Sequence, residues 1–339
     1  MLENWLKKVS SSLTEELSTL SPESIGRSIK IHKNLFPQLD DCQVVIFSDN
    51  STDMDFIRTQ FYNMYHHFDN LFFADLGEIR NSDTNFLINL FNELIESKLI
   101  PIILSNNKEL IHTFHYALNS FNSEFKSLHF GKLNAPYQAN DYANCKSIYS
   151  VGVQGHLVPP SLLNNKHIVR LGDIKNRIEE VEPITRNVDT INFNLNAIKH
   201  SDVPGQIEAS PSGLDSDEFT QLFRYFGYND ILKAIFITGY NSEYDFNRMT
   251  AQLIAQGLWY FIDAKDNCFK ENIDSNEAFN EFVVDIEGLD TPLFFIKAKK
   301  SGRWWLKSHH DHNVLIPCSY RDYEMACKNE IPNRLMETL

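Results

Sequence analysis

Histidine side chains at two places in the chain have a spacing that could serve a metal ion. Residues 309–312 read His-His-Asp-His, which crowds three imidazoles and one carboxylate together, and such tracts can bind metals. Adjacent side chains cannot all turn toward one ion, however, and Lys307 and Ser308 precede the tract. A solvated loop is therefore the better interpretation of residues 309–312.

The second pair, His112 and His115, has the i, i+3 spacing that lets two imidazoles share one face of a helix. No carboxylate lies beside this pair, which favours packing between helices over metal binding. Cys145 and Cys318 have no histidine signature beside them, so we interpret them as buried structural thiols. The sequence contains no G-x-G-x-x-G, Walker or G-x-S-x-G motif, which excludes the usual dinucleotide, nucleotide and serine-hydrolase sites.

The amino-acid composition excludes further classes of function. The 339 residues carry a formal net charge of -14, with 45 acidic against 31 basic side chains, and this balance argues against binding to duplex nucleic acid. The first residues lack a signal-peptide pattern, and no apolar run reaches the ~18 residues of a membrane span. The five cysteines form no C-x-x-C pair. We therefore expect a cytoplasmic protein with free thiols, without membrane insertion.

Alternating strand and helix patterns position these residues. We expect helices near 3–19, 53–68, 85–98, 109–121, 215–227 and 243–264, and strands near 42–47, 71–75, 100–104, 126–130, 147–151, 167–171, 190–195 and 234–237. About eight strands alternating with helices predict a three-layer α/β/α domain around a parallel sheet, over residues 1–265.

The pattern changes in residues 266–339. Residues 281–288 and 291–305 are strand-like runs without a helix between them, which predicts an antiparallel hairpin appended to the sheet edge and packed on the same domain. Residues 317–332 predict a short helix. In the hairpin, Trp304 and Trp305 would face opposite sides of a strand, so that one ring is core and the other is exposed. An exposed ring could anchor a partner protein, with ordinary packing as the alternative.

The stretch 192–214 is the centre of the chain, because a short strand there runs into a long loop rich in turn residues. The loop contains Pro204-Gly205 and then Ser210 to Leu214 (SPSGL). This outline resembles the ureohydrolase superfamily (arginase, agmatinase and formimidoylglutamase), and the RWW and PCSY segments of the tail resemble an arginase-like branch found in Bacteroidetes. The resemblance implies the arginase-like α/β fold described above.

In that superfamily, carboxylates and imidazoles at the strand ends hold two manganese ions. Hard divalent cations require oxygen and imidazole ligands of this kind. The resemblance places other residues at the ligand positions, namely Lys108, Gly131, Leu133, Ala135, Asn194 and Asn196, and it places Gly239 where an acid normally holds the substrate. An ammonium group cannot bind a metal, and asparagine keeps the shape of aspartate without its charge. We therefore expect manganese to be lost, with no cofactor in its place.

Among the residues at these positions, Lys108 is the one with a charged side chain. If it points into the former metal cavity, it needs a partner, for which Asp202 and Asp245 are the candidates. The alternative is that Lys108 extends into solvent at the first turn of its helix.

Two functions remain open from the sequence. The first is a catalytically inactive, arginase-like binding or scaffold component with an unidentified protein partner, which the resemblance associates with gliding and type IX secretion; the chain could also form oligomers. The second is a metal-dependent hydrolase of C–N bonds in linear amidines that uses an atypical ligand set.

Overall fold

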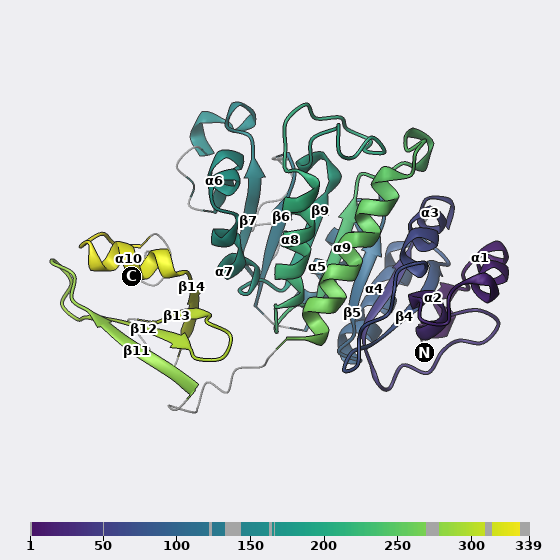
Figure 1. The fold of residues 1–339 in the computed structure, drawn as a ribbon, viewed down its shortest axis with the longest axis horizontal. Helices are drawn as coiled ribbons and strands as arrows, with labels where there is room; N and C mark the ends of the chain where they lie inside the picture. The colour runs from purple at the N-terminus through teal and green to yellow at the C-terminus, as the bar shows by residue number, and fades with distance from the viewer. Residues whose placement is uncertain are drawn as a thin grey trace.

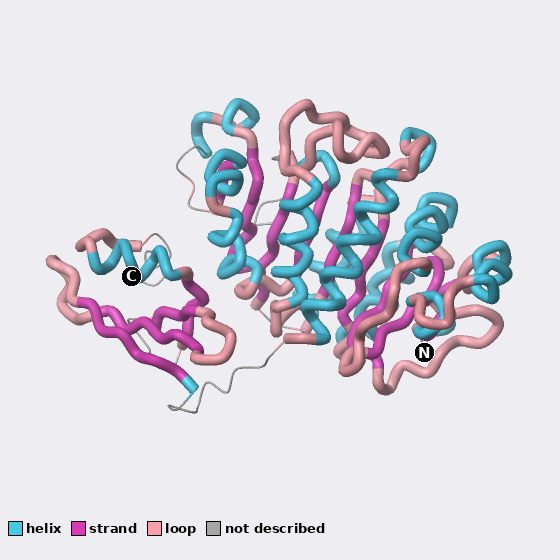
Figure 2. Tube along the Cα trace, in the orientation of Figure 1, coloured by secondary structure: helices cyan, strands magenta, loops and turns pink. Residues whose placement is uncertain are grey.

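The computed structural model describes residues 2–49, 51–121, 124–132, 144–162, 165, 167–268, 278–308 and 314–332 (Figures 1 and 2). In this part of the chain, a ten-stranded sheet has the order β1-β4-β3-β5-β10-β9-β6-β7-β8, with β2 also paired to β4. Neighbouring strands are parallel except β1, which pairs antiparallel with β4. The strands are β1 (Leu6–Lys7), β2 (Lys30–Ile31), β3 (Cys42–Ser48), β4 (Phe72–Ile79), β5 (Ile100–Leu104), β6 (Phe125–Phe130), β7 (Cys145–Val153), β8 (Ile168–Arg170), β9 (Thr190–Asn194) and β10 (Ala234–Thr238).

Helices cover both faces of this sheet, as Figure 1 shows. They are α1 (Ser11–Glu16), α2 (Ile25–Ser28), α3 (Ser51–Tyr62), α4 (Thr84–Glu96), α5 (Glu109–Ser120), α6 (Leu171–Asn176), α7 (Glu182–Thr185), α8 (Ser216–Gly227) and α9 (Met249–Asp266). Alternate residues of β3 enter different cores: Val44 and Ile46 pack with α3, α8 and α9, whereas Val45 and Phe47 pack with α4 and α5. This alternation confirms the predicted three-layer α/β/α architecture.

The predicted helix over residues 3–19 is confirmed only for residues 11–19 and for one short turn at residues 2–4, because β1 interrupts it. Leu6 pairs with Ile79 of β4, and the hydroxyl of Ser10 accepts a hydrogen bond from Leu13 N, so that α1 begins only at Ser11. The acids and apolar residues of this segment have helical spacing, but pairing with the edge of the sheet satisfies the backbone of Leu6 and Lys7 instead.

The C-terminal residues form the predicted antiparallel hairpin, but within a separate four-stranded sheet and not at the edge of the parallel sheet. Its strands are β11 (Phe279–Val284), β12 (Leu293–Ala298), β13 (Trp304–Lys307) and β14 (Leu315–Cys318), antiparallel in sequence order, followed by α10 (Tyr320–Cys327). The run 291–305 splits into β12 and β13 because a turn at Gly302, with a φ of 73°, lets Gly302 N bond back to Ala298 O. Figure 1 shows this sheet beside α10.

Both tryptophans of β13 are buried, so the prediction of one exposed ring is wrong. Trp304 packs in the core between the small sheet and α10, and Trp305 packs with Ile296 and Ala298 on the other face. The Arg186 guanidinium covers the Trp305 ring at 4.7 Å. Neither ring is available as a partner anchor.

Among the helices that the structure describes, none is long and apolar enough to cross a membrane.

Candidate functional site

Polar side chains line one face of the central strands near their carboxyl ends. In β9, Thr190, Asn192 and Asn194 alternate with the apolar core residues Ile191 and Phe193. The register pairs Asn192 with His129 of β6, and it pairs Asn194 with Thr238 of β10. Because paired residues of parallel strands point to the same face, the sheet brings these polar groups together beside α5.

A cavity of about 250 Å³ opens at this edge, where β5, β10, β9 and β6 end. Its polar lining comes from Asn106, Lys108, His129, Asn192, Asn194, Glu208 and Thr238, and its other lining residues are Ile111, Ile207 and Gly239. Open α/β sheets bind ligands outside the carboxyl ends of their strands, at a topological switch point where the strand order reverses. The cavity is therefore the candidate functional site.

Two asparagines at the end of β9 connect the strand to its surroundings through hydrogen bonds. Asn194 Oδ1 accepts from Asn196 N at 2.9 Å. Asn196 Oδ1 accepts from Lys132 N at 3.2 Å, and Asn196 Nδ2 donates to Glu208 Oε2 at 3.1 Å. Both halves of the Asn196 amide are used, which fixes its orientation and requires an amide rather than a carboxylate.

Gly131 and Gly239 border these asparagines in conformations that favour glycine. Gly131 has a φ of 140° and Gly239 has a φ of 90°. A Cβ atom on Gly131 would lie 2.7 Å from Asn196 Oδ1, and one on Gly239 would lie 2.9 Å from Asn194 Oδ1. The backbone thus approaches the amides closely at both positions.

The long loop after β9 is held in place by buried hydrogen bonds. Gln206 Nε2 donates to Leu195 O and Ile198 O, both at 3.1 Å, and Gln206 Oε1 accepts from Ser210 N at 2.7 Å. Gly205 N donates to Thr250 Oγ1 at 2.8 Å, which ties the loop to the start of α9. The loop therefore presents Ile207 and Glu208 to the cavity from a fixed frame.

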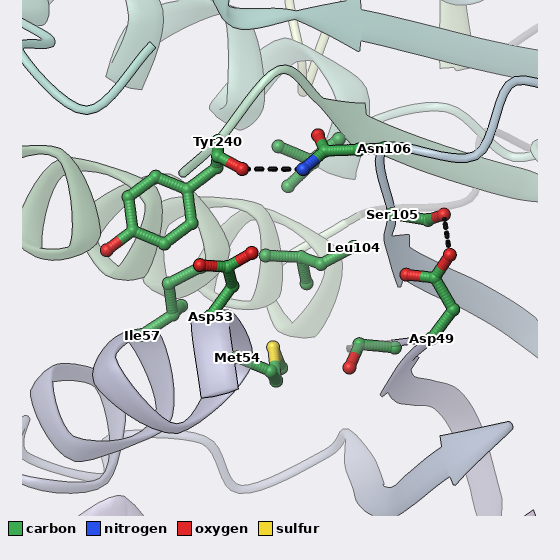
Figure 3. A pocket seen from close by; sticks show the side chains of 10 residues that line it. Asp49, Asp53, Met54, Ile57, Leu104, Ser105, Asn106 and Tyr240 are labelled. Atoms are coloured by element: carbon green, nitrogen blue, oxygen red, sulfur yellow. Dashed lines mark hydrogen bonds between the residues drawn. The ribbon is translucent and has the colours of Figure 1, made fainter. Parts of the chain in front are cut away.

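Asn106 separates the cavity from a smaller one of about 20 Å³, which has room for about one water molecule. Asn106 Nδ2 donates to Tyr240 O at 2.6 Å, and Asn106 Oδ1 accepts from Gly239 N at 2.8 Å. In the small cavity, Ser105 Oγ donates to Asp49 Oδ2 at 2.5 Å (Figure 3). Burial raises the pKa of the Asp49 carboxyl.

Lys108 lines the larger cavity but is exposed, at the N-cap position of α5. Among the described residues it makes no ion pair. The exposure of Lys108 agrees with the alternative that it extends into solvent at the start of its helix. The two carboxylates considered as its partners form their contacts elsewhere. Asp202 lies 3.4 Å from Lys199 Nζ and accepts from Ser216 N at 3.0 Å.

Asp245 is fully buried and caps α9. It accepts from Thr250 N at 3.1 Å and from Ala251 N at 2.9 Å, and the hydroxyl of Tyr240 donates to it at 3.2 Å. Neither Asp202 nor Asp245 lines the cavity. Both carboxylates therefore have structural roles, at the starts of α8 and α9.

Of the other predicted positions, Leu133 and Ala135 lie outside the described residues, as does the tract 309–312. His115 is buried and its Nε2 lies 2.9 Å from Thr190 Oγ1, while burial lowers its pKa to about 3. Burial raises the pKa of Cys145 to about 11. An imidazole and a thiol with these pKa values stay neutral at pH 7.

Asn106, His129, Asn192, Glu208 and Thr238 were not predicted as site residues. The signal for Asn192 and His129 was a polar residue between two apolar neighbours in a strand, in INF and LHF. Both side chains are 5% exposed, and Asn192 Nδ2 lies 2.9 Å from His129 Nδ1. Buried polar side chains of this kind need partners, so such positions point to a polar network.

The molecule is thus a mainly parallel α/β protein with a polar cavity at the carboxyl edge of its central strands. Its fold is that of the ureohydrolases. It is similar to agmatine ureohydrolase of Thermoplasma volcanium (18% identity, TM-score 0.55), with 77% of this chain and 100% of that chain covered. It is also similar to formimidoylglutamase from Bacillus subtilis (16%, TM-score 0.57; 69% and 91% covered) and to Trypanosoma cruzi formiminoglutamase with Mn²⁺ (13%, TM-score 0.60; 69% and 99% covered). Comparison with protein-family models and with curated protein sequences found no match.

The donor set of the cavity does not fit a pair of manganese ions. Manganese prefers carboxylate, imidazole and water ligands, whereas the lining offers three asparagine amides, one ammonium, one hydroxyl, one imidazole and one carboxylate. In the described ranges, no three His, Cys, Asp or Glu side chains are grouped in a way that could hold an ion. We therefore derive no chemical step through a metal at this site.

Proposed function

We propose that this chain is a catalytically inactive protein with the ureohydrolase fold that acts as a binding or scaffold component. The observation that best supports this is the amide of Asn196, whose Nδ2 donates to Glu208 while its Oδ1 accepts from the Lys132 amide. A carboxylate at position 196 would face Glu208 without a donor, so the site depends on a neutral amide here.

Electrostatics at the rest of the cavity supports the same conclusion. Burial lowers the pKa of His129 to about 4, and the nearby charge of Lys108 lowers it further, against a hydrogen bond with the Lys132 backbone that raises it. The cavity then contains a cation where a metal site needs anionic ligands. A divalent ion would have to overcome repulsion from the Lys108 ammonium.

A binding or scaffold role implies a protein partner, for which the sequence resemblance suggests the gliding and type IX secretion machinery. The alternative, a C–N hydrolase with an unusual ligand set, would need at least three metal ligands at the cavity. His129 and Glu208 are the lining residues of suitable type. Two such ligands are fewer than the three that catalytic metal sites usually take from the protein.

Elemental analysis tests the proposal. Untagged protein from manganese-supplemented medium should carry well under one equivalent of manganese and release no urea from arginine or agmatine, because amides and an ammonium do not retain the ion. A manganese-dependent agmatinase purified in parallel serves as the control for metal loss. Stoichiometric manganese, or urea release that a chelator abolishes, would sink the proposal.

A further inference from the structure

The cavity has a positive charge that no carboxylate balances. Its charged lining residues are Lys108 and Glu208. Glu208 has Lys132 Nζ at 3.6 Å as well as the Asn196 amide at 3.1 Å, whereas Lys108 makes no ion pair within the described part of the chain. Since burial lowers the pKa of His129 to about 4, this imidazole adds no charge at pH 7. The cavity therefore has a local excess of one positive charge in a protein whose net charge is -14.

The same cavity contains polar atoms that the protein itself does not use. Asn192 is 5% exposed, and its Oδ1 has no hydrogen-bond partner among the described residues. The oxygen and nitrogen of an amide can exchange places by rotation. In either orientation one polar atom of Asn192 faces His129 Nδ1, and the other has no partner among the described residues. A buried amide atom left in this way is costly to the protein, and a bound molecule can remove that cost.

Two further groups on the lining are suited to donate hydrogen bonds. Asn194 uses its Oδ1 for Asn196 N, and its Nδ2 makes no hydrogen bond within the described ranges. Thr238 is 6% exposed, and its hydroxyl likewise makes none there. Both residues are neighbours in the β9–β10 register, so their polar groups lie side by side at the cavity.

Helix α5 begins at this cavity, with Lys108 at its N-cap position and Ile111 in its first turn, both on the lining. The N-terminus of a helix carries a partial positive charge and favours anions. Ile111 and Ile207 supply an apolar wall beside it. The chemistry offered is thus a cation and hydrogen-bond donors next to a small apolar surface.

We propose that this cavity binds a small oxyanion, namely an organic carboxylate whose oxygens contact Lys108, Asn194 and Thr238 while its apolar part packs on Ile111 and Ile207. The inference deepens the proposed function, on which it rests, by giving the ligand class of the metal-free cavity. A guanidinium or a divalent cation would be repelled by the same ammonium. The cavity volume of about 250 Å³ corresponds to about eight water molecules. This space is sufficient for a small organic carboxylate.

Calorimetric titration of protein in EDTA-containing buffer, at constant ionic strength, tests this inference. The probes are butyrate, acetate, inorganic phosphate and, as a cation of similar size, agmatine. We expect butyrate to bind more tightly than acetate, because only butyrate has an apolar part to bury on the isoleucines. Phosphate that binds more tightly than butyrate would overturn the carboxylate assignment, and so would agmatine that binds as tightly as butyrate.

Variants locate the binding. Lys108→Met should weaken butyrate binding by about tenfold or more, because it removes a charged hydrogen bond, and Thr238→Val, nearly isosteric, should weaken it by about fivefold for one neutral bond. Lys146→Met is the matched control: Lys146 is 53% exposed, lies in β7 near its amino end and pairs with Glu124. Equal butyrate affinity in wild type, Lys108→Met and Lys146→Met would overturn the inference, as would absence of binding to wild type.

The two proposals fail separately. Because EDTA removes manganese from every titration, a lack of butyrate binding contradicts the anion site without bearing on the metal content. Stoichiometric manganese in the elemental analysis contradicts the inactive-enzyme proposal, whatever the titrations give.

Discussion

Buried imidazoles determine how single residues of this protein respond to pH. His115 packs against Phe125 with ring centroids 5.0 Å apart, and burial lowers its pKa to about 3. Burial likewise lowers the pKa of His129 to about 4. In the unfolded chain both imidazoles would titrate near pH 6.5. Below that pH the unfolded state binds two protons that the folded state does not bind.

We therefore predict that the free energy of unfolding falls as the pH drops below about 6.5. Each group contributes about 1.4 kcal/mol per pH unit, so that unfolding at pH 5.0 should be easier by about 4 kcal/mol than at pH 7.5. Urea denaturation at the two pH values measures the difference. His115→Gln should remove about half of it, whereas His156→Gln, which changes an exposed imidazole, should leave it unchanged. A difference that persists in full in His115→Gln would contradict the assignment.

The residues of the site could be predicted only in part from the sequence. Lys108, Asn194 and Gly239 were singled out, and the structure places all three on one cavity. Their role as former ligand positions stays a prediction. Asn192 and His129 were missed because their hydrogen bond joins strands 63 residues apart in the sequence, and no local pattern reveals a partner at that distance.

At the scale of secondary structure, strand and helix alternation was informative because each parallel strand is buried on both faces and reads as an apolar run. Residues 42–47 and 100–104 became β3 and β5 almost unchanged. The tail was harder to predict. Gly302 was not recognised as a turn, and without that turn β12 and β13 merge into one long strand with one face exposed.

Capping decides where α9 begins, and this gives an element-scale prediction. Asp245 is fully buried, and its carboxylate receives hydrogen bonds from Thr250 N, Ala251 N and the Tyr240 hydroxyl. Asp245→Ala leaves these buried donors without a partner, so we expect it to reduce the free energy of unfolding by about 2 to 4 kcal/mol. Urea denaturation at pH 7.5 measures the loss.

The neighbouring Glu243 provides the control for Asp245, because its side chain is exposed in the same loop. Glu243→Ala should change the free energy of unfolding by less than about 0.5 kcal/mol. If Asp245→Ala is as stable as Glu243→Ala, the carboxylate of Asp245 does not stabilise the start of α9.

At the scale of the whole molecule, the described chain consists of two separately packed bodies. The parallel sheet has its own apolar cores, and the β11–β14 sheet has another, built with α10. Several contacts join them, including a hydrogen bond from Ser319 to Glu180 and an ion pair between Arg303 and Glu182. The most buried of these links is Arg186, at the end of α7, which donates from Nη2 to Trp304 O at 3.1 Å and lies over the Trp305 ring. Its Nε lies 2.7 Å from Glu182 Oε1, so the guanidinium is paired inside the junction.

Removing this guanidinium should release the small sheet while leaving the large one intact. Arg186→Gln loses the contacts to the Trp304 carbonyl and the Trp305 ring and leaves Glu182 without its close cation, a change of about 3 kcal/mol at the junction. We expect amide hydrogen exchange in β12 and β13 to accelerate about a hundredfold, since each 1.4 kcal/mol corresponds to a factor of ten. Exchange in β5 and β10, which pair in the middle of the parallel sheet, should stay within about threefold of wild type.

Arg177→Gln provides the matched control, because Arg177 is exposed on the same side of the junction, where it lines a cleft between the two bodies. It should leave exchange unchanged in both sheets. Equal acceleration in β5, β10, β12 and β13 of Arg186→Gln would mean that the chain unfolds as one cooperative unit. In that case the C-terminal sheet is part of the same domain as the parallel sheet, as the sequence predicted, and Arg186 stabilises the whole fold rather than the junction.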